Sequence, residues 1–228
     1  MKDSFTIDLK SYPLEKYLEV LKEMDFIPSR RILKEDTVRR FALLKNEGFD
    51  DLEQLSEGLK SPEKVAALAE KTGIPNEFLT ILKREMSGLN RPPALLKEFP
   101  GVDSGAVGRL EQGGIKNARQ FFEAALTKEG RASLAEKFGM DTASVLDLTK
   151  LCDVSRLYGV GPVFARMLVE SGCDTTAKIA RCDPPSLFEK LMRINDAKGY
   201  TQAKFRVQDM EYCRNFAKNF PDTDNYAE

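Results

Sequence analysis

Apolar residues recur every three or four positions along most of the chain, which is the spacing of one face of an α-helix. The clearest runs are Leu14/Tyr17/Leu18/Leu21, Val65/Leu68/Ala69, Leu187/Phe188/Leu191/Ile194 and Met210/Cys213/Phe216/Phe220. The alternation typical of a strand occurs only at Phe5, Ile7 and Leu9, which is too short a stretch to predict one. The pattern therefore predicts an all-α fold built from short helices.

One segment of the apolar pattern occurs three times. The segment FALLKNEGFDDLEQL (41–55) aligns with VGRLEQGGIKNARQF (107–121) at an offset of 66 residues, and FARMLVESGCDTTAKI (164–179) follows after a further 58. In all three, a glycine follows an amphipathic run, at Gly48, Gly114 and Gly172. A glycine just past a helix is typical of a left-handed C-cap. We therefore predict three tandem, degenerate units of short helices.

Breaks in the pattern divide the chain into five segments. Asn90-Arg91-Pro92-Pro93 is the clearest break, and Asp153–Arg156 is a weaker one. We expect an N-terminal extension with one helix (1–28), a first unit (29–90), a second unit (91–153), a third unit (154–220) and an acidic tail (221–228).

The composition is that of a globular domain, with 42% hydrophobic and 31% charged residues among 228. No apolar run approaches the length that crosses a bilayer, and the first ten residues have no apolar signal-peptide core. These features predict a cytoplasmic protein that does not interact with a membrane. They leave its oligomeric state open.

The chain contains no histidine, and its four cysteines form no CxxC pair. Structural zinc sites need about four closely paired ligands, so we expect no metal and interpret the cysteines as small core residues. Without histidine the commonest general base is absent, as is every Ser-His or Cys-His nucleophile. We therefore expect a protein without enzymatic activity and without a cofactor.

The charge is unevenly distributed. The whole chain carries a net charge of −1, which gives no overall signature of nucleic-acid binding. Residues 155–218 contain eleven Lys/Arg and seven Asp/Glu, whereas 219–228 carry three acids. The third unit is therefore mildly basic.

The third unit also contains a specific short motif, Leu157-x-Gly159-Val160-Gly161-Pro162-x-x-Ala165-x-x-Leu168-x-x-x-Gly172. It resembles the helix-hairpin-helix motif, and residues 155–218 are similar to a related bacterial domain family of unknown function. The glycines allow close backbone approach, and Pro162 suits the first turn of a helix. The turn would leave N–H groups free at a helix N-terminus, which attracts anions.

The resemblance implies binding to the DNA phosphate backbone without sequence preference. Backbone donors would come from Gly159, Gly161 and Val163, and Arg166 and Arg156 would add charge. The sister units depart from the motif: Asp103 stands at the place of Gly161 in the second unit, and Glu35 and Thr37 replace both glycines in the first. We therefore expect a nucleic-acid site in the third unit alone.

Two alternatives stay open at this point. The hairpins could serve only as packing corners in a protein-interaction or scaffold protein. DNA binding requires a basic face beside the turn, formed by Arg156, Arg166, Lys178 and Arg181, whereas Asp174 or Glu170 over the turn would remove its basis. The basic stretch PSRRILKEDTVRR (28–40) could be a second phosphate-contacting edge, or a solvated helix face with its charges paired.

Overall fold

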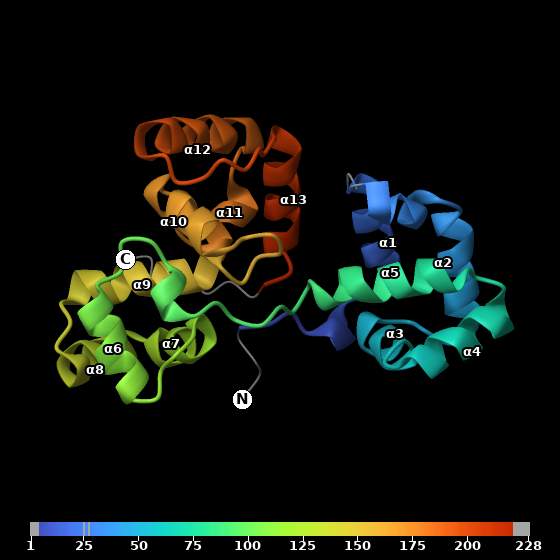
Figure 1. Ribbon diagram of the computed structural model, residues 1–228, viewed down its shortest axis with the longest axis horizontal. Coiled ribbons are helices and arrows are strands. Elements are labelled where there is room, and N and C mark those ends of the chain that lie inside the picture. Colours follow the sequence, from blue (N-terminus) through green and yellow to red (C-terminus); the bar gives the residue numbers. More distant parts are fainter. Residues whose placement is uncertain (1–4, 25, 27, 221–228) are drawn as a thin grey trace. The chain divides into compact units, whose positions relative to one another are not determined.

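The computed structural model describes residues 5–24, 26 and 28–220, and these residues confirm the all-α class. They form thirteen α-helices and three short 3-10 helices, with isolated β-bridges and no strand (Figure 1). Phe5 and Ile7, from the short alternating stretch, are buried without forming a strand. The predicted acidic tail at 221–228 lies outside the described residues. Among the described helices, none is long and apolar enough to cross a membrane.

The chain divides into two compact units. The N-terminal unit is Ile7–Asn90, and the C-terminal unit comprises Arg91–Glu228 together with Met1–Thr6. The division falls at the Asn90-Arg91-Pro92-Pro93 break that the sequence marks most clearly. Phe5 belongs to the C-terminal unit because its ring packs edge-on against Phe122, with centroids 5.8 Å apart.

The N-terminal unit is built around leucines with no exposed surface, among them Leu21, Leu44 and Leu52. Helix α1 packs on α2, and the 3-10 helix η2 packs on α5. Residues 12–24 are therefore part of the compact unit, whereas the sequence had suggested an appended segment ending at residue 28. The elements are η1 (Leu9–Ser11), α1 (Leu14–Glu23), η2 (Pro28–Lys34), α2 (Thr37–Asn46), α3 (Leu52–Gly58), α4 (Pro62–Thr72) and α5 (Asn76–Ser87).

The C-terminal unit contains the segments expected as second and third units, packed into one body. Helix α9, which ends the second segment, packs against α10 of the third, so no domain boundary lies between them. The elements are η3 (Leu96–Glu98), α6 (Ser104–Gln112), α7 (Ala118–Ala125), α8 (Lys128–Phe138), α9 (Thr142–Val154), α10 (Pro162–Glu170), α11 (Thr176–Arg181), α12 (Pro184–Lys198) and α13 (Val207–Ala217).

Helix boundaries recur at the offsets found in the sequence. Helices α3, α7 and α11 begin at residues 52, 118 and 176, which are again 66 and 58 residues apart. The glycines before them, Gly48, Gly114 and Gly172, have φ of 90°, 91° and 85°. Only glycine adopts this region without strain. The three segments are called the first, second and third copy below; that they arose by repetition stays a prediction of the sequence.

In two copies a backbone carbonyl accepts a hydrogen bond from the first residue of a helix, α3 or α7. In the third copy, at the start of α11, a side chain accepts this bond instead. In the first copy Leu52 N–H donates to Tyr12 O, and in the second Ala118 N–H donates to Ala94 O. The equivalent N–H in the third copy, on Thr176, donates instead to a side chain, the Oδ2 atom of Asp153, at 2.8 Å. A buried carboxylate thus takes the place of a backbone carbonyl.

Candidate nucleic-acid interface

In the turn between α9 and α10, only the first of the two motif glycines has a positive φ. Gly159 is exposed with φ of 80°, and Val160 is buried, with its N–H donating to Leu157 O at 3.1 Å. Gly161 has φ of −86° and ψ of 176°, an extended conformation open to any residue. A Cβ atom added at Gly159 or Gly161 would meet no atom within 4 Å. The turn is therefore accessible, and only Gly159 is required by its conformation.

Helix α10 begins at this turn without a side-chain cap. Gly161 is its N-cap residue, and no side chain accepts from its first N–H groups. In the second copy the equivalent cap is made by Asp103, whose Oδ2 accepts from Ala106 N–H at 2.6 Å. The N-terminus of α10 therefore keeps donors that a carboxylate occupies in the sister helix.

A cation that the sequence did not suggest lies beside the turn. Arg91 is exposed, and its Nη2 donates to Val160 O at 3.4 Å. It comes from the Pro-rich break before the second copy, which is 69 residues away in the chain. No local pattern links Arg91 to the turn, so only the folded unit reveals it.

Arg156, expected as a phosphate contact, lies in the interior. Its side chain has no exposed surface and is paired with Asp153, whose side chain is also fully buried. Nη2 also donates to Thr176 Oγ1 at 3.0 Å, and the guanidinium lies 4.5 Å from the centroid of Phe122 and 4.6 Å from that of Phe220. Arg156 is committed to the core because every face of its charge is already in contact with the protein.

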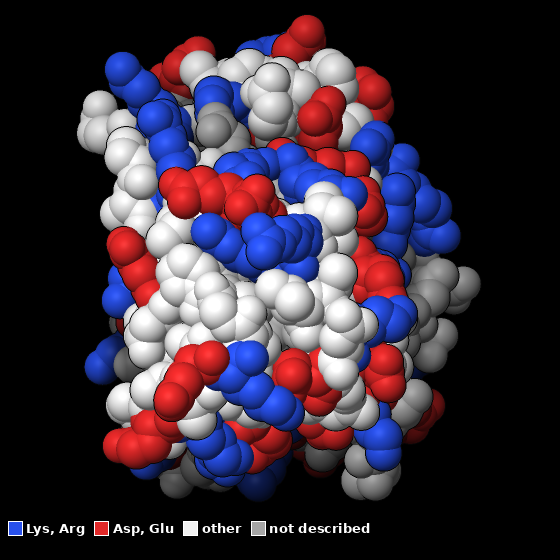
Figure 2. All heavy atoms as spheres, turned by 90° about the vertical axis from the view of Figure 1, so that its right-hand side faces the viewer, with Lys and Arg blue, Asp and Glu red and all other residues white. Residues whose placement is uncertain are grey.

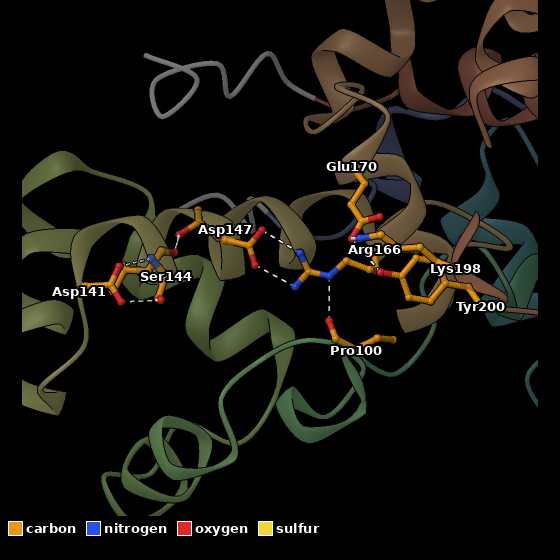
Figure 3. A network of polar contacts seen from close by, with 10 residues as sticks. Pro100, Asp141, Ser144, Asp147, Arg166, Glu170, Lys198 and Tyr200 are labelled. Atoms are coloured by element: carbon orange, nitrogen blue, oxygen red, sulfur yellow. Dashed lines mark hydrogen bonds and ion pairs between the residues drawn. The ribbon is translucent and has the colours of Figure 1, made fainter. Parts of the chain in front are cut away.

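Arg166 is likewise occupied, and it joins the second and third copies. Its two terminal nitrogens contact the carboxylate of Asp147 at 2.9 and 2.8 Å, and its Nε donates to Pro100 O at 2.8 Å (Figure 3). A bidentate arginine–carboxylate pair of this kind is among the stronger ion pairs in proteins. A Cβ at Gly101 would lie 3.7 Å from the guanidinium, an ordinary van der Waals distance. Arg166 thus grips the turn of the second copy and is not free for a phosphate.

The two acids that could have covered the turn, Glu170 and Asp174, are both bound to other side chains. Glu170 accepts from Lys198 Nζ at 3.0 Å and from Tyr200 Oη at 2.7 Å (Figure 3). Burial raises the pKa of Glu170, but the bonds from Tyr200 and Lys198 outweigh it and hold that pKa below its ordinary value.

Asp174 is buried between two lysines, with Lys150 and Lys178 each 2.6 Å from its carboxylate. Lys178, expected to contribute positive charge beside the turn, is therefore paired. Burial raises the pKa of Asp174, but the two lysines outweigh burial and keep that pKa below its ordinary value.

All four cysteines are free thiols; Cys152 and Cys213 are buried, as expected of core residues, whereas Cys173 and Cys182 are only half-buried. Burial raises the pKa of Cys182 to about 11 and that of Cys213 to about 12, and nearby Cys173 adds to both shifts. The sequence did not suggest that these three cysteines would lie near one another. Within the described ranges, no group of three or more His, Cys, Asp or Glu side chains could hold a metal ion. Thiolate chemistry is disfavoured at such pKa values.

Fold and site together define an all-helical protein whose C-terminal unit pairs two helical hairpins, one of which has an open, glycine-containing turn. Comparison with protein families gives a match over residues 100–216 to a domain of unknown function, DUF4332. The match covers just over half of the chain, and the protein belongs to this family. It spans both hairpins of the C-terminal unit, whereas the resemblance drawn from sequence covered 155–218. No curated protein and no solved structure matches the chain.

Proposed function

We propose that the protein binds the phosphate backbone of nucleic acids, without sequence preference, through the turn Gly159–Val163 used as a helix-hairpin-helix turn. One observation carries the proposal: this turn is open and its helix is uncapped, whereas a carboxylate occupies the sister turn. Backbone N–H groups at a helix N-terminus bind phosphate by geometry and by dipole. The phosphate would lie over Gly161 and contact the N–H groups of Gly161 and Val163.

The cation at this site is proposed to be Arg91. It lies at the turn, whereas Arg156 and Arg166 hold the core together. With one turn and one arginine, few phosphates are contacted, so the dependence of affinity on salt is expected to be shallow, with a slope of about −1 to −2. On the face of the molecule that Figure 2 shows, basic and acidic side chains are interspersed.

The proposed role is non-enzymatic and needs no cofactor, because binding to a backbone requires donors and charge only. Duplex DNA, single strands and RNA all present the phosphates concerned. A location in the cytoplasm stays a prediction of the sequence.

The second candidate function is a protein scaffold, and a specific observation favours it as well. Arg156 and Arg166, which the motif would offer to DNA, instead make contacts within the C-terminal unit. Arg166 donates directly to a backbone carbonyl of the neighbouring turn. In that case the turn of the third copy is only a packing corner, and its open face has no ligand.

Gly161→Asp separates the two candidates. Its extended backbone accepts an aspartate, and the new carboxylate would cap α10 as Asp103 caps α6. We therefore expect the free energy of unfolding to be unchanged or raised by a few tenths of a kcal/mol. The new carboxylate at position 161 would at the same time repel a phosphate. Gly108→Asp is the matched control. It adds the same charge within α6, at a half-buried position with no atom within 4 Å of the new Cβ.

The measurement is fluorescence anisotropy of labelled duplex DNA, single-stranded DNA and RNA, at salt between about 50 and 200 mM. We expect the wild type and Gly108→Asp to bind alike, and both Gly161→Asp and Arg91→Glu to bind at least several-fold more weakly. Absence of binding by the wild type, or equal binding by Gly161→Asp and Gly108→Asp, would refute the proposal and leave the scaffold function.

A further inference from the structure

A row of three phenylalanines begins at the turn of the third copy. Phe164 lies on α10, Phe188 lies on α12, and Phe205 lies between them on the segment before α13. The ring centroids of Phe164 and Phe205 are 5.5 Å apart, and those of Phe188 and Phe205 are 5.8 Å apart. We call these three residues the aromatic row.

The aromatic row differs from the other phenylalanines in its exposure. The chain contains fourteen phenylalanines, and ten of them are buried. The three of the row are half-buried, as is Phe49 of the N-terminal unit. In both pairs of the row the rings meet edge to face, at interplanar angles of 75° and 76°, so neither pair is stacked face to face. The row therefore presents aromatic surface to solvent.

Phe164 stands next to the proposed phosphate donors. It directly follows Val163 and is the third residue of α10, whose N-terminus has no side-chain cap. The equivalent residue of the second copy, 58 positions earlier, is Ala106, whose N–H donates to the carboxylate of Asp103. The third copy therefore has a ring where the second has a methyl group, in the same turn that lacks the capping carboxylate.

The segment that carries Phe205 is basic. Residues 199–206 join α12 to α13 (Figure 1), and they include Lys204 and Arg206 on either side of Phe205 but no acid. Lys204 is exposed, and its ammonium group forms no hydrogen bond or ion pair with any residue that the structure describes. Aromatic rings combined with positive charge are typical of surfaces that bind single-stranded nucleic acids.

From these observations we infer that the aromatic row stacks on the bases of a single-stranded nucleic acid whose phosphates are bound at the turn. The inference rests on the proposed function and narrows its ligand to single strands. A base whose phosphate is bound by the N–H of Val163 is within reach of the next ring along the helix, that of Phe164. In a duplex the bases are stacked on one another and offer no face to the row. Every base has a π face, so stacking adds no sequence preference.

The first test compares oligo(dT) with an abasic strand of the same length, which has the same sugars and phosphates but no bases. In the anisotropy assay, at one salt concentration, we expect the wild type to bind oligo(dT) at least about five-fold more tightly than the abasic strand or a duplex. That is the lower end of the gain from one stacked base. Oligo(U) is the RNA counterpart: tighter binding of oligo(U) than of oligo(dT) assigns the row to RNA, and the reverse assigns it to DNA.

The second test uses variants of the full chain, with folding checked by circular dichroism. Phe164→Leu removes a ring and keeps an apolar side chain. It is expected to lose most of the preference for oligo(dT), with an unchanged dependence on salt, because the ring carries no charge. Phe49→Leu is the matched control, since Phe49 is the half-buried phenylalanine outside the row. The chain has no tryptophan, so the indole of Phe205→Trp should be quenched by oligo(dT) but not by the abasic strand.

Equal binding of oligo(dT) and the abasic strand, or equal effects of Phe164→Leu and Phe49→Leu, would overturn the inference. So would an indole in Phe205→Trp that oligo(dT) does not quench, because the rings would then only pack against one another. In each of these cases the proposed function could still stand on Gly161→Asp, since phosphates alone would bind at the turn. Absence of binding by the wild type to all of these probes would remove both.

Discussion

Removing the charge of Arg156 should destabilise the C-terminal unit far more than a phosphate-contacting arginine would. Its side chain and that of Asp153 both have no exposed surface, so each charge relies on the other. The substitution Arg156→Met keeps a long apolar side chain between the rings of Phe122 and Phe220. What it removes is the partner of a buried carboxylate.

The expected loss follows from this burial. Breaking a buried ion pair by removing one partner typically costs about 3–5 kcal/mol, because the remaining charge stays desolvated. The N–H of Thr176, at 2.8 Å from Asp153 Oδ2, offsets part of this cost but carries no full charge. A loss of about 3 kcal/mol or more would lower the melting temperature by on the order of 10 °C.

The double substitution Asp153→Asn with Arg156→Met is the control for the charge itself. It removes both charges, while the side-chain carbonyl at position 153 can still accept from Thr176 N–H. We expect the double variant to be more stable than Arg156→Met alone, since replacing a buried pair by neutral groups is often close to neutral.

Urea unfolding followed by far-UV circular dichroism measures these differences, since the chain contains no tryptophan. Hydrogen exchange at Thr176 reports on the same bond locally. A loss below about 1 kcal/mol for Arg156→Met, the range of an exposed pair, would refute the reasoning. So would a double variant that is less stable than both single variants.

Three further predictions concern the backbone, pH and the thiols. Gly114→Ala should lower the free energy of unfolding by about 1–2 kcal/mol, because its φ of 91° strains any side chain; chemical denaturation measures this, and no loss would contradict the assigned backbone. Because the pKa of Asp174 is lowered in the folded state, its contribution is present above its unfolded pKa and is lost as pH falls through the folded one. Acid unfolding profiles should therefore flatten in Lys150→Met, and an unchanged profile would exclude the pair as the cause. Cys213, with its pKa raised to about 12, should resist alkylation near pH 8 until the protein is unfolded, as mass spectrometry would show.

Most of the architecture could be predicted from the sequence, because helix positions and helix ends depend on residues that are close together in the chain. A glycine after an amphipathic run predicts a left-handed helix end, and Gly48, Gly114 and Gly172 all have this conformation. The division after Asn90 coincides with a Pro-rich break. Fold class needs little more than periodicity and caps, which depend on neighbours within one helix turn.

The site was harder to predict because its charges are decided by distant partners. Arg166 meets Asp147 from 19 residues away and Pro100 from 66 residues away. Arg91, which does lie at the turn, is 69 residues from it. A motif places an arginine near a turn in sequence, but it does not say which face of the helix meets another copy. Asp153 within the apolar run of α9 was the one signal available, since a carboxylate among buried residues needs a partner.

The contacts of Arg166 with Pro100 and Asp147 also make the second and third hairpins depend on each other. A fragment that contains the third hairpin alone would keep Arg166 but lose both of its partners, Pro100 and Asp147. Its guanidinium would then be exposed to solvent at the surface that the second hairpin covers in the full chain. The third hairpin is therefore expected to be less stable without the second hairpin than together with it. The family match, which begins at Pro100, covers both hairpins.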